Sequence, residues 1–258
     1  MRKIAVNGRV FEIAVAVFDK DGLLFDSRAF WCGLAQARLD AALRYLTEET
    51  VLEWLAVMDV RAGKDADGKL RVEEVKPDGV TAVASPDEEV MITAAFLLQR
   101  LYHDWPKSRE TAREIFAEGD RRLDLEKAIA PRAGFPGIFR RLREAGIPYG
   151  IATSDDLQRA EKSVGMYDDF GKLDFVITPR DVKRNKPAPD MLELVAKRYA
   201  VEGRQILMVG DSYVDMMMAD AAGAVGIGIP EFTHMERRMR PYAAALAKTL
   251  DDIVILKE

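Results

Sequence analysis

Two wholly apolar runs that lie far apart in the chain are each followed by aspartates. The runs are residues 14–18 and 206–209, and the aspartates after them are Asp19, Asp21, Asp211 and Asp215. A strand that is apolar at every position is typical of a parallel sheet, which is covered on both faces. Because the carboxyl ends of neighbouring parallel strands meet in one crevice, we expect these carboxylates to lie close together. Their combined negative charge requires a cation.

From residue 134 onward, short apolar segments alternate with segments of helical periodicity. The expected strands are residues 149–153, 174–177, 205–209 and 225–229. Such alternation predicts an α/β fold with a doubly wound, Rossmann-like parallel sheet. Near the start of the chain, Asn7-Gly8 predicts a type I′ turn between strands at residues 3–6 and 10–13.

The tract between Ser27 and Ala130 is far longer than a parallel crossover requires. It therefore predicts an inserted α-helical domain, residues 28–130, within a core of residues 1–27 and 131–258. Proline and glycine residues follow the tract, and such crossings suit an insert that moves relative to its host.

Helical periodicity within the insert predicts three long helices, at residues 30–46, from Pro86 onward and at about 108–128. Ser85 and Glu88 form a capping box at the start of the second. Residues 63–74 resemble a calcium loop, but Gly63 stands where the first ligand should be, so we expect a hairpin or loop there.

Composition excludes several kinds of partner. The formal net charge is −5 without an evident basic patch, which argues against a nucleic-acid binder. Cys32 is the single cysteine, so no intramolecular disulfide can form. The first residues lack a signal-peptide pattern, and no run approaches the ~18 apolar residues of a membrane-spanning helix. We therefore expect a cytoplasmic protein, monomeric or homodimeric, without membrane or nucleic-acid partners.

Four short motifs follow one another, each at an expected strand end or helix start. They are D-x-D-G-x-x-x-D at Asp19, Asp21, Gly22 and Asp26, the pair Thr153-Ser154, the pair Lys186-Pro187, and G-D-x-x-x-D at Gly210, Asp211 and Asp215. In order and spacing the set resembles the haloacid-dehalogenase-like phosphohydrolases, in the phosphatase branch that includes phosphoglycolate phosphatase and beta-phosphoglucomutase. The insert lies where that branch carries a helical cap of the first type.

The resemblance implies a Mg²⁺-dependent phosphatase that hydrolyses a small phosphorylated metabolite. Asp19 would attack phosphorus to form an aspartyl-phosphate. Asp21, two residues on, would point to the same side in extended chain, protonate the leaving oxygen and later activate water. Asp19 and Asp211 would bind Mg²⁺ through their side chains, and Asp21 through its backbone carbonyl.

The same resemblance implies how phosphate is held. Thr153 and the backbone N–H of Ser154 would bind phosphate oxygens, and Lys186 would supply a fixed positive charge. Asp215 would hold Lys186 or a metal-bound water. Asp26 is as well placed to cap the first insert helix as to brace the site.

Three alternative functions would each require a residue pattern that differs from the one in this chain. Mutases similar to beta-phosphoglucomutase carry a His where this chain has Trp31, which disfavours a sugar-phosphate mutase. A receiver-type signalling domain would place its Lys after all its acidic residues, whereas Lys186 precedes Asp211. A catalytically silent binding relative usually lacks a motif carboxylate, and none is missing here. Asp21 also disfavours the dehalogenase and phosphonate-cleaving branches.

Substrate selection is expected in the insert, because the core motifs handle only phosphate and metal. The basic and aromatic candidates are Trp31, Arg38, Arg61, His103 and Trp105. In the core, Met216-Met217-Met218 is expected to pack against the sheet.

Overall fold

The computed structural model describes residues 1–101 and 104–256, so His103 lies outside the described residues. The chain divides into two compact units. One combines Met1–Asp26 with the chain from Pro131 onward, and the other is Ser27–Ala130.

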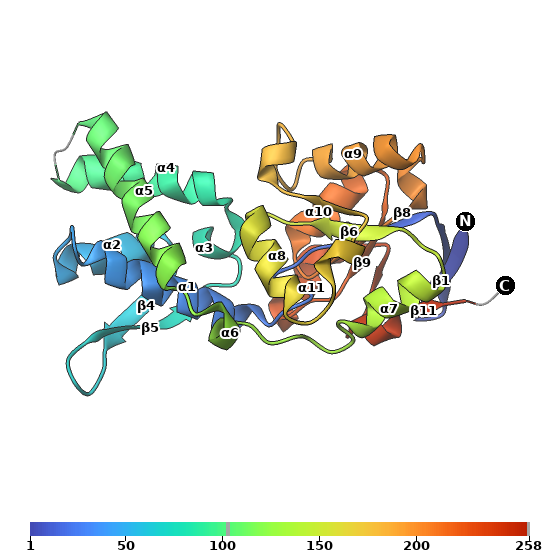
Figure 1. Ribbon diagram of the computed structural model, residues 1–258, viewed down its shortest axis with the longest axis horizontal. Helices are drawn as coiled ribbons and strands as arrows, with labels where there is room; N and C mark the ends of the chain where they lie inside the picture. The colour runs from blue at the N-terminus through green and yellow to red at the C-terminus, as the bar shows by residue number, and fades with distance from the viewer. Residues whose placement is uncertain (102–103, 257–258) are drawn as a thin grey trace. The chain divides into compact units, whose positions relative to one another are not determined.

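Within the described residues, the first unit is built on a six-stranded sheet whose paired strands are all parallel (Figure 1). In spatial order the strands are β10 (Ala245–Leu246), β9 (Val225–Gly228), β8 (Ile206–Gly210), β3 (Val15–Phe18), β6 (Tyr149–Ala152) and β7 (Phe175–Ile177). The chain moves from β3 outward through β6 to β7 and then returns to β8 on the other side of β3. The prediction of a doubly wound parallel sheet is confirmed.

Helices cover both faces of this sheet. On one face, α9 (Asp190–Tyr199) and α10 (Tyr213–Ala221) share a buried apolar cluster with β3, β6, β7 and β8. On the other, α7 (Gly137–Glu144) brings Phe139 within 5.3 Å of the Phe18 ring and 4.7 Å of the Tyr149 ring, between centroids. Met216 and Met218 on α10 are fully buried, which confirms the predicted packing for these two, whereas Met217 between them is half-buried.

The start of the chain forms the predicted hairpin of β1 (Arg2–Val6) and β2 (Arg9–Ile13). Asn7 and Gly8 have φ angles of 49° and 79°, as a type I′ turn requires. β11 (Val254–Ile255) pairs with β1. The remaining helices of this unit are α8 (Leu157–Gly165), α11 (Thr233–Met239) and the 3₁₀ turns η1 (Phe170–Lys172), η2 (Pro179–Asp181), η3 (Gly203–Gln205) and η4 (Leu250–Asp252).

The second unit combines helices with one hairpin. Its elements are α1 (Ser27–Ala42), α2 (Glu48–Val57), β4 (Val60–Lys64), β5 (Leu70–Val75), α3 (Val80–Val83), α4 (Pro86–Leu101), α5 (Trp105–Arg122) and α6 (Leu125–Ala128). At the start of α4 the Ser85 N–H and hydroxyl both donate to Glu88 Oε2, at 2.7 and 2.8 Å, which is one of the two contacts of the predicted capping box. The hairpin β4–β5 contains residues 63–74, and the Asp65 carboxylate accepts from the N–H groups of Asp67 and Lys69 within its turn.

Helix boundaries in this unit differ from the prediction where polar caps interrupt the apolar pattern. α1 ends at Ala42, and Thr47 then caps α2, a helix that the pattern analysis missed. The expected helix at about 108–128 is two helices, capped by Asp104 and Asp124. Short polar side chains satisfy the first N–H groups of a helix, so each such residue can start a new one.

Arg38 is wrong as a candidate for substrate contact. Its side chain is 3% exposed, donates to Glu89 Oε1 at 2.8 Å and lies over the Phe116 ring. The Arg38 guanidinium group is therefore buried against Glu89 and Phe116 inside the second unit rather than exposed to a substrate. None of the helices in the described part of the chain is long and apolar enough to cross a membrane.

Candidate active site

Three buried or half-buried aspartates gather at the carboxyl edge of the sheet. Asp19 follows β3, Asp211 follows β8, and Asp215 lies on the first turn of α10. Each offers a carboxylate oxygen, and these oxygens lie within 4.8 Å of one another. Because β3 and β8 are neighbours at the point where the strand order reverses, residues from opposite ends of the chain meet there.

Lys186 joins two of these aspartates. Its Nζ donates to Asp19 Oδ1 and to Asp215 Oδ1, both at 2.6 Å, and its side chain is 3% exposed. Asp215 is held from its other side by the Ser212 hydroxyl, which donates to Oδ2 at 2.5 Å. The ammonium group therefore has a fixed place beside Asp19.

The cluster carries more negative charge than Lys186 offsets. Burial, with repulsion from Asp215 and Asp21, raises the pKa of Asp19 from 3.8 to about 7 despite the attraction of Lys186. Burial, with Asp19 and Asp215 as neighbours, holds the pKa of Asp211 well above its ordinary value. Burial alone would lower the pKa of Lys186, but Asp19 and Asp215 outweigh it and raise that pKa.

The donor set suits a hard divalent cation. All three groups are carboxylates, and Mg²⁺ prefers a few carboxylate oxygens together with water and phosphate. A divalent charge among them would also offset the repulsion that raises the pKa of Asp19 and Asp211. The residues present therefore fit the magnesium that the motifs imply.

Gly22 brings the loop after β3 against Asp211. Its φ is +80°, and a Cβ atom there would lie 2.1 Å from Asp211 Oδ2. The Gly22 N–H donates to Phe25 O at 3.0 Å, and Arg132 donates to Gly22 O from its side chain and to Leu24 O from its backbone. Only glycine allows both this turn and this approach.

Asp21 lies outside the aspartate cluster of Asp19, Asp211 and Asp215. Its carboxylate contacts Lys20 Nζ, although it is close enough to Asp19 to raise the pKa of that residue. β3 ends at Phe18, but the Asp19 N–H still donates to Val209 O at 2.9 Å. Asp21 forms an isolated bridge with Phe25, and the turn begins only at Gly22. That Asp19 and Asp21 share one side stays a prediction. Burial outweighs the attraction of Lys20 and raises the pKa of Asp21 itself.

Thr153 and Ser154 follow β6, the other neighbour of β3. Thr153 is buried, and its Oγ1 accepts from the Asp155 N–H at 3.0 Å. The hydroxyl proton remains able to donate to another group. Ser154 is half-buried in the bend that leads to α8.

Sequence reasoning missed Lys20, Asp155 and Arg159. The Lys20 side chain is fully buried, and its Nζ lies 3.0 Å from Asp155 Oδ2. Arg159 Nε donates to Asp155 Oδ1 at 2.7 Å. Two signals were present: a lysine directly between two motif aspartates, and two adjacent aspartates where a single N-cap would suffice for α8.

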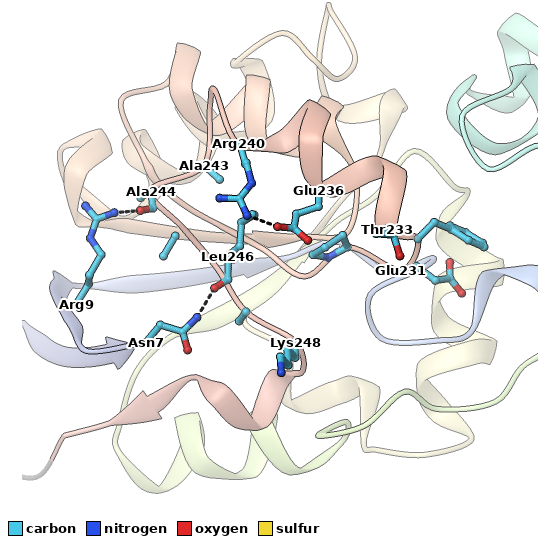
Figure 2. Close-up of a pocket in the computed structure, with 14 residues that line it drawn as sticks. Asn7, Arg9, Glu231, Thr233, Glu236, Arg240, Ala243, Ala244, Leu246 and Lys248 are labelled. Carbon is cyan, nitrogen blue, oxygen red and sulfur yellow. Dashed lines mark hydrogen bonds and ion pairs between the residues drawn. The ribbon is translucent and has the colours of Figure 1, made fainter.

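A separate groove of about 680 Å³ follows the outer edge of β10 (Figure 2). Asn7 donates to Leu246 O at 2.6 Å and Arg9 donates to Ala244 O, so side chains of the β1–β2 turn satisfy edge carbonyls there. The aspartate cluster is not part of its lining. Glu231, at one end of the groove, is close enough to Asp211 to help raise its pKa.

Comparison with protein families agrees with this geometry. The family model of haloacid dehalogenase-like hydrolases matches residues 13–223, which include both the aspartate cluster and Lys186. The chain belongs to this family.

Several curated relatives of this hydrolase are phosphoglycolate phosphatases. The phosphoglycolate phosphatase of Escherichia coli K12 is 31% identical over 229 residues, which cover 84% of this chain and 81% of the relative. That of Salmonella choleraesuis is 30% identical over 224 residues, 82% of this chain and 79% of the relative. The predicted assignment to the phosphatases of this family is confirmed.

Solved structures share the fold of this hydrolase. A family IA hydrolase from Entamoeba histolytica aligns with a TM-score of 0.59 at 19% identity, over 94% of this chain and 96% of that one. CbbY from Rhodobacter sphaeroides, solved in complex with phosphate, aligns with a TM-score of 0.53 at 18% identity, over 92% and 95%.

Proposed function

We propose that this hydrolase is a Mg²⁺-dependent phosphatase that cleaves a small phosphomonoester through an aspartyl-phosphate on Asp19. The observation that carries the proposal is the cluster of Asp19, Asp211 and Asp215 with Lys186 bridging Asp19 and Asp215. Such an arrangement combines a nucleophile, a cation site and a fixed positive charge within reach of one phosphate group.

In the first step, Asp19 attacks phosphorus. Lys186 binds Oδ1, which leaves Oδ2 to form the new bond to phosphorus as the bond to the leaving oxygen breaks. Asp21 gives its proton to that oxygen, so the product leaves as a neutral alcohol. In the second step, water gives a proton to Asp21 as its oxygen attacks the same phosphorus. The bond between phosphorus and Asp19 Oδ2 breaks, which releases inorganic phosphate and restores the Asp19 carboxylate.

The phosphate oxygens need positive charge and hydrogen-bond donors throughout. Lys186, the Thr153 hydroxyl and the Ser154 N–H supply them from this chain. Mg²⁺, held by the side chains of Asp19 and Asp211 and the Asp21 carbonyl, would neutralise the phosphate oxygens and offset the carboxylate repulsion. Asp215 keeps Lys186 in place rather than touching substrate.

We assign the choice of substrate to the inserted unit, residues 28–130, in the role of a cap domain. The substrate class is a small phosphorylated metabolite, with 2-phosphoglycolate first on the panel because the curated relatives are phosphoglycolate phosphatases. Trp31, Arg61 and Trp105 are the candidate contacts among the described residues of the unit. Nucleic acid and membrane are not expected partners.

The test compares Asp19→Asn with the wild type. We expect Mg²⁺-dependent release of phosphate from p-nitrophenyl phosphate by the wild type and a loss of about 10³-fold or more in the variant, because an amide cannot replace the nucleophile. Asp220→Asn is the matched control, since Asp220 is exposed on α10, and it should keep full activity. Activity retained in Asp19→Asn would reject the nucleophile.

A further inference from the structure

Lys20 is buried to an unusual degree for a lysine. Its side chain has no exposed surface, although it lies between two residues of the candidate site. Lysine is almost never fully buried unless it is paired, because removal of the ammonium group from water is costly. Its Nζ contacts both the Asp21 carboxylate and Asp155 Oδ2, the latter at 3.0 Å.

The contacts continue into α8. Arg159 Nε donates to Asp155 Oδ1 at 2.7 Å, and Arg159 also pairs with Asp156 at 2.9 Å. Asp156 in turn caps α8 by accepting from the Arg159 N–H at 2.9 Å. A continuous chain of ion pairs therefore connects the loop after β3 to the first turn of the helix after β6.

Stability alone does not account for this arrangement. Replacing a buried ion pair with packed apolar side chains is often neutral or stabilising. The chain of contacts ends on Asp21, whose carboxyl group must meet the leaving oxygen in the proposed reaction. Asp21 lies beyond the end of β3, in an isolated bridge with Phe25, so the sheet itself does not orient its side chain.

We propose that Lys20 and Asp155 are positioning residues that hold the Asp21 carboxyl group toward the leaving oxygen. Lys20 Nζ donates a hydrogen bond to Asp21 Oδ1 and forms an ion pair with Asp155 Oδ2 at 3.0 Å. Asp21 Oδ2 is then left to carry the proton. Asp155 accepts from Arg159 on α8 and so fixes the position of the Lys20 ammonium group, which in turn keeps the Asp21 side chain in one rotamer. This inference rests on the role proposed for Asp21.

The test uses two substrates that differ in their need for a proton. An alkyl phosphomonoester releases a strongly basic alkoxide, whereas p-nitrophenyl phosphate releases a phenolate that leaves unprotonated. Because kcat/KM reports the step in which the leaving group departs, the alkyl-to-aryl ratio of kcat/KM reports proton donation. 2-Phosphoglycolate is the first alkyl substrate, and glycerol 2-phosphate the second.

In Lys20→Met and in Asp155→Asn we expect kcat/KM for the alkyl substrate to fall about 10²-fold. For p-nitrophenyl phosphate, kcat/KM should fall only about tenfold. Both substrates are measured on one preparation, so any unfolded fraction cancels from the ratio. The alkyl-to-aryl ratio of kcat/KM in the double variant should be no lower than in Lys20→Met, because both residues act through one contact. Lys197→Met, an exposed site on α9, should leave the ratio unchanged.

Equal losses on the two substrates, or no loss, in both Lys20→Met and Asp155→Asn would overturn the inference and assign these residues to folding alone. Asp21→Asn is the reference and should show the largest fall in the ratio. An Asp21→Asn variant with a normal ratio would reject Asp21 as the acid, and the positioning role with it. Failure of the proposed nucleophile is seen separately, in Asp19→Asn.

Discussion

Asp19 and Asp211 are held where a negative charge is unfavourable. Their pKa values lie above the ordinary range because both are buried and face other carboxylates, and Lys186 offsets only part of the repulsion. Groups with such shifts commonly belong to functional sites, where a bound cation or substrate completes the charge balance. Gly22 adds a steric condition, since it is the residue that lets the loop pass against Asp211.

Gly22→Ala should lose activity out of proportion to its loss of stability. The new Cβ would lie 2.1 Å from Asp211 Oδ2, so the carboxylate has to move, and a φ of +80° adds about 1–2 kcal/mol of backbone strain. We expect at least about a tenfold loss of kcat, measured beside the urea unfolding curve.

Gly8→Ala is the matched control for that change. Gly8 has a φ of +79° with no atom near the new Cβ, so it should show a similar backbone cost with normal kcat. Equal activity in the two variants would contradict the contact with Asp211.

At the scale of elements, the second unit depends on a buried ion pair between α1 and α4. Arg38 donates to Glu89 Oε1 at 2.8 Å, both side chains are 3% exposed, and α5 supplies the Phe116 ring beneath the guanidinium. Gly119 on α5 leaves room for this packing, because a Cβ there would lie 2.6 Å from Arg38 Cγ. The pair therefore connects three helices.

Glu89→Leu should destabilise the protein by about 3–5 kcal/mol, because it leaves the buried Arg38 charge with only the longer contact to Asp120, at 3.7 Å. The double variant Arg38→Met/Glu89→Leu removes both charges and should recover most of that loss. Urea unfolding measures the three free energies. Additive losses in the double variant would mean that the two side chains contribute independently.

At the scale of the whole molecule, the sheet topology brings distant segments to one site. β3 and β8 are adjacent in the sheet although most of the chain lies between them. Every residue proposed for catalysis or metal binding belongs to the unit that contains the sheet, while the insert forms a separate compact unit. Folding buries these carboxylates beside one another and raises the pKa of Asp19 and Asp211. The stability of the metal-free protein should therefore change with pH.

Stability without metal should fall as pH rises toward 7. The pKa of Asp19 is about 7 in the folded protein against 3.8 ordinarily, so the folded state retains a proton that the unfolded chain loses. The resulting stabilisation is complete below about pH 4 and is lost as pH rises through about 7. Thermal melting in EDTA across this range tests the direction, and Asp19→Asn should weaken the dependence.

Mg²⁺ should stabilise the protein more at pH 8 than at pH 5, because the cation binds ionised carboxylates. At about one hundred times its Kd, the expected gain is about 2.7 kcal/mol, or about 5–10 °C in Tm. Equal shifts in Tm at the two pH values would contradict binding at Asp19 and Asp211. The double variant Asp19→Asn/Asp211→Asn is the control and should show little shift at either pH.

The sequence by itself determined the doubly wound sheet, the hairpin at Asn7-Gly8 and the segments that carry the aspartates and Lys186. These features depend on local patterns: apolar runs that end in carboxylates, turn residues and capping boxes. The tertiary structure decided that Lys186 bridges Asp19 and Asp215, that Asp21 turns toward Lys20, and that Arg38 is buried against Glu89. Asp19, Asp21 and Lys186 lie outside helices and strands, where periodicity gives no side-chain direction. Arg38 lies in α1 and Glu89 in α4, and there periodicity shows which face is apolar but not which distant helix packs against it. In both cases packing between distant segments decides the contact.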